Sequence, residues 1–235
     1  MPTLLLLPGL MCDASVWAPQ IDALSLLARC HVVDYGIRNS LSAMAQQVLD
    51  EAPAQRFALA GHSMGGRVAL EVLRLAPERI SHLALLDTGT HPLSAGEAGD
   101  KERAGRLALL AQAQAHGMRA MGSQWLRGMV PAALIDTPLY EGMLAMVERS
   151  SPVHFAAQIE ALLNRPDAAG LLSSVSCPTL VLTGRYDSWS PPEQHRQMAQ
   201  AIPGSLLCIV EECGHMSTLE QPLAVNAALT TWLSR

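Results

Sequence analysis

The stretch Arg56–Pro77, RFALAGHSMGGRVALEVLRLAP, decides the fold of this chain. Its first part, Arg56–Ala60, is a short apolar run typical of a buried strand, and Val68–Ala76 carries apolar residues at helical spacing until Pro77 ends the helix. Between them lies the pentapeptide Gly61-His62-Ser63-Met64-Gly65. A sharp turn from a buried strand into a helix is therefore predicted at Ser63.

The flanking sequence repeats this alternation of strand and helix. Strands are predicted at Thr3–Leu7, Cys30–Val33, Ile80–Leu86, Pro178–Thr183 and Ser205–Val210. Helices are predicted at Val16–Ala28 with Ser15 as N-cap, at Ser40–Ala52 and at about Gln221–Leu233. Alternating strands and helices predict an α/β fold with a mostly parallel sheet and helices on both faces.

One long segment interrupts the alternation. From about residue 91 to 169 the chain is rich in Ala, Met and Gln and shows no clear strand pattern, which predicts a helical insertion. The expected organisation is one core domain formed by residues 1–90 and 170–235, with residues 91–169 inserted as a helical cap.

Composition limits the possible functions. The chain has 235 residues, with 16 Lys and Arg against 21 Asp and Glu for a net charge of −5, and no basic run that would favour binding to nucleic acid. No apolar stretch is long enough to span a bilayer, and no signal peptide is recognisable. The five cysteines lack paired C-x-x-C spacing, so neither a metal site nor a disulfide framework is expected. A cytoplasmic protein without a cofactor is predicted.

The pentapeptide is the strongest chemical signal. A G-x-S-x-G sequence between a strand and a helix is typical of a nucleophile elbow, in which glycines permit a tight turn that exposes the serine hydroxyl at a helix N-terminus. Ser63 is accordingly the predicted nucleophile. A serine hydroxyl needs a general base to attack at neutral pH, and that base needs an orienting acid.

His215 is the predicted base, because Cys213-Gly214-His215-Met216 follows a strand and precedes a helix. Asp187, in a glycine-containing loop after another strand, is the predicted acid, and the order Ser63, Asp187, His215 matches this class of site. Asp87, at the end of the strand Ile80–Leu86, is the alternative acid. The backbone amides of Leu10 and Met64 are the predicted oxyanion donors.

These motifs, with Gly184-Arg185-Tyr186-Asp187 and Gly214-His215, resemble the α/β-hydrolase superfamily, particularly its small capped carboxylesterases and, distantly, the pimeloyl-carrier-protein methyl ester esterases. The resemblance spans Leu4 to Leu233. It implies an eight-stranded sheet, here without its first two strands, and a helical cap over the active site. The His-Gly usual before the oxyanion donor is Pro8-Gly9 here.

Two groups of side chains in the insertion have open interpretations. Methionines and one tryptophan are candidates for an adaptable acyl pocket, with Met121 and Trp125 as the selected substrate-binding residues, but packing between cap helices accounts for them equally well. The pocket candidates are Met118, Met121, Trp125, Met129, Met143 and Met146. Four arginines are candidates for contact with an acidic substrate or carrier, or form a solvated helix face: Arg103, Arg106, Arg119 and Arg127.

The sequence thus predicts a serine hydrolase of the carboxylic ester class (EC 3.1.1) that cleaves an ester of a small or medium apolar acid through an acyl-enzyme. The substrate is a small molecule or an acyl group carried by a protein. The alternatives are a non-hydrolytic enzyme of the same fold, such as a cofactor-independent dioxygenase or lyase, and a ligand receptor with slow turnover.

Overall fold

The structure, a computed structural model, describes all 235 residues. Its centre is one six-stranded sheet in which every strand pair is parallel and the strand order is β2-β1-β3-β4-β5-β6. The strands are β1 (Thr3–Leu7), β2 (Arg29–Val32), β3 (Phe57–His62), β4 (Ile80–Leu86), β5 (Thr179–Gly184) and β6 (Leu206–Val210). Six strands agree with the expected loss of two from the eight-stranded arrangement.

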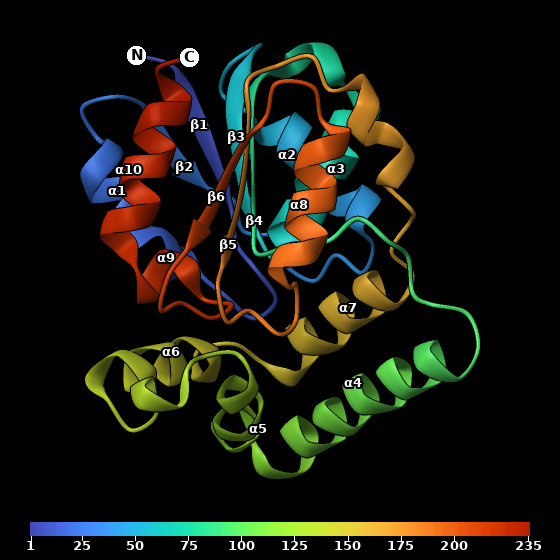
Figure 1. Ribbon diagram of the computed structural model, residues 1–235. Coiled ribbons are helices and arrows are strands. Elements are labelled where there is room, and N and C mark those ends of the chain that lie inside the picture. The colour runs from blue at the N-terminus through green and yellow to red at the C-terminus, as the bar shows by residue number, and fades with distance from the viewer.

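Helices cover both faces of the sheet, which explains why the central strands are apolar runs rather than alternating patterns. One face carries α1 (Ala18–Leu24) and α10 (Pro222–Leu233), and the other carries α2 (Leu41–Glu51), α3 (Met64–Leu75) and α8 (Pro192–Ala201) (Figure 1). Short helical turns are η1 (Ala14–Trp17), η2 (Pro77–Arg79) and α9 (Ser217–Glu220). All six residues of β3 are buried, as are all six of β5.

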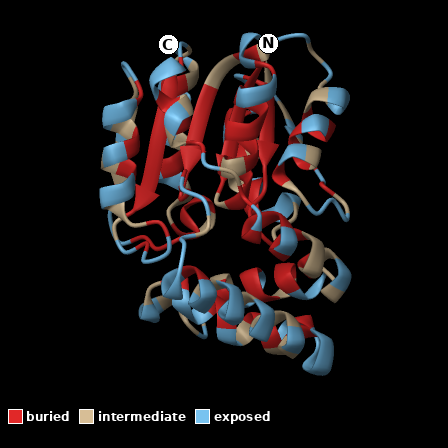
Figure 2. Cartoon of the chain, turned by 90° about the vertical axis from the view of Figure 1, so that its right-hand side faces the viewer, coloured by how far each residue is buried: buried red, intermediate tan, exposed pale blue.

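The segment between β4 and β5 contains no strand and lies beyond the carboxyl ends of the sheet strands (Figure 1). Its helices are α4 (Glu97–His116), α5 (Met118–Trp125), α6 (Pro138–Glu148) and α7 (Pro152–Leu163), with short turns η3 (Leu126–Gly128), η4 (Ala132–Leu134) and η5 (Ala169–Ser174). Figure 2 shows buried residues on the sides of these helices that face one another and the sheet, with exposed residues on their outer sides. We call the segment Glu97–Leu163 the helical insertion.

Several element boundaries differ from those predicted. The predicted helix Val16–Ala28 is a turn of 3₁₀ helix followed by α1, which ends at Leu24. The N-cap predicted at Ser15 is wrong: the Asp13 side chain accepts a 2.8 Å hydrogen bond from the Ser15 amide and caps the 3₁₀ turn. Helix α3 begins at Met64, directly after Ser63, and α8 was not predicted as an element. None of the helices combines the length and hydropathy needed to cross a membrane.

Candidate active site

The turn at Ser63 is as tight as the pentapeptide predicts. Ser63 has φ of 55° and ψ of −115°, a backbone conformation that side chains rarely adopt. The glycines permit it: a Cβ on Gly65 would lie 2.1 Å from the Leu7 carbonyl oxygen, and one on Gly61 would lie 2.3 Å from the Gly65 oxygen. Both obstacles are backbone atoms, which cannot move aside, so the close packing of β1, β3 and α3 requires glycine at both positions.

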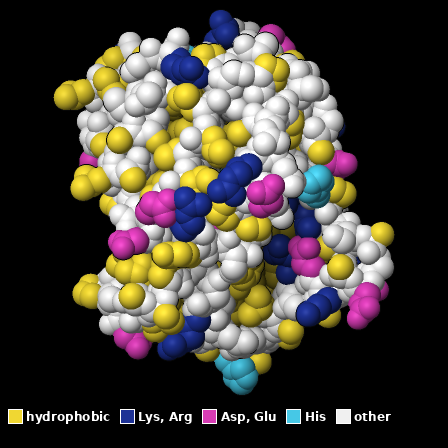
Figure 3. Space-filling view, in the orientation of Figure 1, with side chains coloured by type: hydrophobic (Ala, Val, Ile, Leu, Met, Phe, Trp, Pro, Cys, Tyr) yellow, Lys and Arg dark blue, Asp and Glu magenta, His cyan; other side chains and the backbone are white.

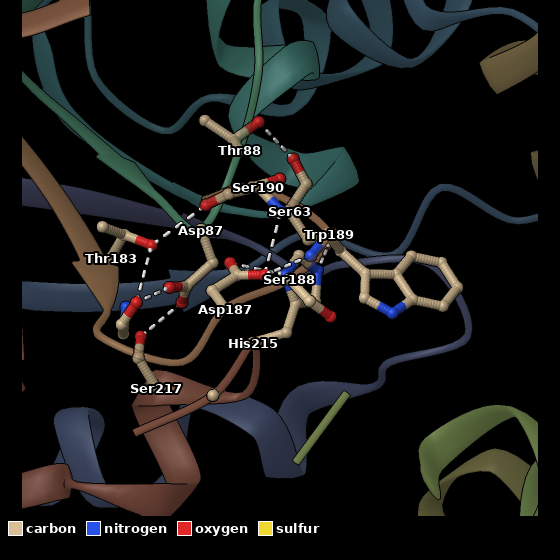
Figure 4. A network of polar contacts seen from close by, with 12 residues as sticks. Ser63, Asp87, Thr88, Thr183, Asp187, Ser188, Trp189, Ser190, His215 and Ser217 are labelled. Carbon is tan, nitrogen blue, oxygen red and sulfur yellow. Dashed lines mark hydrogen bonds and ion pairs between the residues drawn. The ribbon is translucent and has the colours of Figure 1, made fainter. Parts of the chain in front are cut away.

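The structure brings Ser63, His215 and Asp187 into one hydrogen-bonded chain (Figure 4). The Ser63 Oγ lies 2.8 Å from Nε2 of His215, and Nδ1 of the same ring lies 2.8 Å from Oδ2 of Asp187. The three side chains come from the turns after β3, β5 and β6, which meet at the carboxyl edge of the parallel sheet. We call this arrangement the Ser–His–Asp chain.

Asp187 is held in place by the backbone of its own loop. Its Oδ1 accepts hydrogen bonds of 2.9 Å from the amides of both Trp189 and Ser190, which leaves Oδ2 for His215. Burial acts to raise the pKa of Asp187, but the charge and hydrogen bond of His215 and the two amides outweigh it, so the pKa falls below its ordinary value. Asp187 is therefore a carboxylate at neutral pH.

The pKa of His215 is shifted in the opposite direction, upward. Desolvation acts to lower its pKa, while the charge and hydrogen bond of Asp187 raise it, and the net pKa lies above that of an ordinary histidine. The imidazolium form is thus stabilised where a proton from Ser63 would arrive. The ring remains neutral, and able to act as a base, only at pH values above this raised pKa.

Asp87, the alternative acid, lies close to this chain but takes no part in it. Its Oδ1 accepts a 3.1 Å hydrogen bond from the Gly184 amide, and its Oδ2 is hydrogen-bonded to the Ser217 hydroxyl (Figure 4). Full burial and then the nearby Asp187 charge raise the pKa of Asp87 well above its ordinary value. The Asp87 carboxyl thus bonds to Gly184 and Ser217, whereas the His215 ring bonds to Asp187.

The two amides predicted as oxyanion donors border the same cavity as Ser63. Met64 is the first residue of α3, so its amide is among those with no partner within the helix, and it lies at the positive end of the helix dipole. Leu10 follows Gly9, whose Cβ position lies 3.2 Å from the Ser63 Cβ. The loop after β1 therefore lies directly against the serine.

The cavity beside Ser63 measures about 740 Å³ and lies between the sheet edge and the helical insertion. Trp125 and Met129 line it, whereas Met121 does not: Met121 is fully buried in the apolar core. The other methionines selected from the sequence, Met118, Met143 and Met146, are also buried and outside the lining. No group of three or more His, Cys, Asp or Glu side chains is placed to hold a metal ion.

The helical insertion is attached to the loops that carry the site. The His215 amide donates a 2.7 Å hydrogen bond to the Met129 carbonyl, and the Trp189 indole donates one of 2.9 Å to the Gly128 carbonyl. The Trp189 ring centre lies 6.1 Å from that of His215 and 6.1 Å from that of Trp125. Trp189 thus links the insertion to the histidine, a role that its sequence position after Asp187 did not reveal.

His62 is a second residue whose role the sequence did not indicate. Its Nε2 donates a 2.8 Å hydrogen bond to the His215 backbone carbonyl. Complete burial lowers the pKa of His62 to about 4, so the ring is neutral. His62 therefore fixes the backbone of the histidine loop from within the Ser63 turn.

The family model for the alpha/beta hydrolase family matches residues 4–228, and the chain belongs to this family. A putative carbamate hydrolase, RutD, of Pseudomonas syringae pv. syringae is 29% identical, over 99% of this chain and 94% of the relative. A 2-hydroxy-6-oxononadienedioate/2-hydroxy-6-oxononatrienedioate hydrolase of Klebsiella pneumoniae is 26% identical, over 87% of this chain and 72% of the relative. The chain is thus a hydrolase relative throughout its length.

A solved structure with a similar fold is a thermophilic esterase from Thermogutta terrifontis in a malate-bound form. It superimposes with a TM-score of 0.88 at 27% identity, covering 100% of this chain and 90% of the esterase. The likeness includes the helical insertion, since the whole chain is covered. The resemblance inferred from the sequence motifs and the predicted α/β-hydrolase fold are therefore confirmed.

Proposed function

We propose that this protein is a serine hydrolase that cleaves a carboxylic ester through an acyl-enzyme intermediate. The observation that carries the proposal is the continuous hydrogen-bonded path from Ser63 Oγ through His215 to Asp187, with 2.8 Å at both steps. Such a path activates a serine hydroxyl for attack on a carbonyl carbon. The thermophilic esterase with the same fold supports an ester as the substrate.

In the first half-reaction, Ser63 Oγ attacks the ester carbonyl carbon while its proton passes to Nε2 of His215. Asp187 stabilises the imidazolium and holds Nδ1–H toward itself. The Leu10 and Met64 amides bind the oxyanion of the tetrahedral intermediate. As the intermediate collapses, the bond to the alkoxy oxygen breaks, His215 gives its proton to that oxygen, and the alcohol leaves.

In the second half-reaction, a water molecule occupies the place of the alcohol. His215 removes a proton from this water, whose oxygen attacks the acyl carbon of the Ser63 ester. The second tetrahedral intermediate collapses with return of the proton to Ser63 Oγ and release of the carboxylic acid. No cofactor is needed, because every bond change is an acyl or proton transfer.

A direct test is labelling with a fluorophosphonate probe together with an ester hydrolysis assay. We expect the probe to modify Ser63 in the wild-type protein, and the Ser63→Ala variant to lose labelling and at least about 10³-fold in kcat. Ser217→Ala is a matched control, since Ser217 bonds to Asp87 and lies outside the Ser–His–Asp chain. Ester hydrolysis that persists in Ser63→Ala would contradict the proposal, as would oxygen consumption or lyase activity without any ester hydrolysis.

A further inference from the structure

Arginine side chains gather on one side of the cavity beside Ser63. Arg67 of α3, Arg106 of α4 and Arg165, just after α7, all line it, and the acidic side chain of Glu102 stands among them. Figure 3 shows basic and acidic side chains gathered beside the hollow between the two halves of the molecule. Lys101, next to Glu102 on α4, also lines the cavity. With three guanidinium groups, one ammonium group and the Glu102 carboxylate, this side of the cavity carries an excess of positive charge.

Arg165 is fully engaged within the protein. It forms a two-pronged ion pair with Glu102, with distances of 2.8 and 2.9 Å, and donates to the carbonyl groups of His91, Leu162 and Pro92. A guanidinium has five N–H donors, and these contacts use all of them. Arg165 and Glu102 therefore form a fixed support that ties α4 to the end of α7.

Arg67 and Arg106 have donors to spare. Arg67 makes one side-chain hydrogen bond, from Nη1 to the His91 carbonyl at 2.9 Å, and no ion pair. Arg106 makes one through Nε to Oε1 of Glu102, at 2.9 Å, so both of its terminal nitrogens are unused. Glu102 is already shared with Arg165, so its one negative charge faces two guanidinium groups.

Both side chains are half-buried, and this partial loss of water makes the excess charge costly. Desolvation, followed by repulsion from Arg165 and Arg106, lowers the pKa of Arg67 to about 9, at which it remains protonated at neutral pH. Desolvation also lowers the pKa of Arg106. Charges that are withdrawn from water are ordinarily paired, so the half-buried Arg67, which has no carboxylate partner in the cavity, indicates a place for an anion.

The proposed anion site lies close to the nucleophile Ser63. Arg67 lies four residues after Ser63, one turn further along α3, which is about 6 Å along the helix axis. Gly89 borders the cavity here, and a Cβ on it would lie 3.0 Å from Nη2 of Arg67. The absence of a side chain at position 89 leaves room for the guanidinium to lie along the cavity wall.

We propose that Arg67 and Arg106 bind a carboxylate group of the substrate, so that the ester cleaved at Ser63 also carries a free carboxylate at its far end. The inference rests on the proposed hydrolysis at Ser63 and defines its substrate class as half esters of dicarboxylic acids and related anionic esters. Arg67 and Arg106 act as binding residues, and Arg165 with Glu102 positions Arg106. Apolar side chains of the cavity, Leu109, Trp125, Met129 and Leu162, accommodate the carbon chain between the two ends.

The experiment compares two esters of nearly equal shape. Monomethyl adipate carries a carboxylate and dimethyl adipate does not, and initial rates are measured by alcohol release. For wild-type protein we expect kcat/KM to be at least about tenfold higher for the half ester. Arg67→Met and Arg106→Met should each lower kcat/KM for the half ester by about 10- to 100-fold, as for a lost charged hydrogen bond, and change it less than threefold for the diester.

Arg119→Met is the matched control, because Arg119 lies on α5, is paired with Glu141 and Glu148, and is outside the cavity lining. It should leave both rates unchanged. Binding without turnover is measured by calorimetry with adipate on Ser63→Ala, and should be lost when Arg67→Met is added. Circular dichroism checks that each variant is folded.

The outcomes separate this inference from the proposed function. Equal rates for the two esters that neither arginine variant alters would overturn the carboxylate site while leaving ester hydrolysis intact. Tighter calorimetric binding of inorganic phosphate than of adipate would overturn the assignment to a carboxylate. Adipate binding that depends on Arg67, without hydrolysis of any ester or labelling of Ser63, would support the anion site and contradict the proposed function.

Discussion

Replacing Asp187 by Asn should prevent His215 from acting as a base, with almost no change in the shape of the site. Trp189 and Ser190 both donate their amides to Oδ1 of Asp187. In the Asn variant this position must therefore hold the amide oxygen, and the NH₂ group must occupy the position of Oδ2, facing His215 Nδ1. An NH₂ group donates a hydrogen bond, so Nδ1 becomes an acceptor and the ring proton moves to Nε2.

With its proton on Nε2, His215 donates to Ser63 and cannot accept the serine proton. We expect kcat to fall by about 10³- to 10⁴-fold, which corresponds to about 4 to 5.5 kcal/mol of barrier height. The assay is steady-state ester hydrolysis, with kcat corrected for the folded fraction. Since the change is isosteric, KM and the melting temperature should change little.

Asp87→Asn is the matched comparison. Asp87 lies outside the Ser–His–Asp chain and accepts from the Gly184 amide and the Ser217 hydroxyl. In the variant, the asparagine oxygen can still accept from Gly184, and the NH₂ group can donate to the Ser217 oxygen. We expect less than a tenfold loss of kcat. A greater loss in Asp87→Asn than in Asp187→Asn would refute the reasoning and make Asp87 the orienting acid.

Three further outcomes follow from the burial and charges of the site. First, kcat/KM should fall on acidification with an apparent pKa above that of an ordinary histidine, because neutral His215 is the base and its pKa is raised. In Asp187→Asn the apparent pKa of any residual activity should be lower than in the wild-type protein. Burial lowers the pKa of His195 to about 4, so the neutral ring stabilises the fold fully above about pH 6.5, and this stabilisation is lost as the pH falls toward 4. The free energy of unfolding in urea should therefore differ less between pH 7 and pH 5 in His195→Gln than in the wild-type protein. Trp125→Ala should change the ranking of esters by kcat/KM, because Trp125 lines the cavity, whereas Met121→Ala should cost about 2 to 5 kcal/mol of stability and leave the ranking unchanged.

The sequence was informative where backbone geometry restricts the choice of residue. Gly61 and Gly65 cannot be replaced without collision with backbone atoms, so the turn at Ser63 has a recognisable sequence. Strand β4 was predicted with its observed ends, because its apolar run is bounded by a proline-containing turn and by Asp87. The juxtaposition of Ser63, Asp187 and His215 followed from one rule, that parallel strands end at a common edge.

The roles of side chains in the helical insertion were harder to predict from the sequence, because helical periodicity does not indicate which apolar side chains line a cavity and which pack in the core. Met121 and Trp125 lie on the same short helix, yet only Trp125 reaches the cavity. Arg106 was one of four arginines that the sequence made equal candidates for contact with an acidic substrate. Its unused hydrogen-bond donors become evident only from its contacts beside Arg165 and Glu102. Arg67 offered a signal that was overlooked, since a residue four positions after the nucleophile lies on the adjacent helical turn.

The most direct test of the account is to trap the acyl-enzyme itself. Wild-type protein is mixed with a p-nitrophenyl ester, quenched in acid within milliseconds, and examined by intact and peptide mass spectrometry. The account predicts a burst of p-nitrophenol together with one acyl group attached to Ser63, both absent in Ser63→Ala. Steady turnover with no adduct at Ser63, or with the acyl group on another residue, would contradict it.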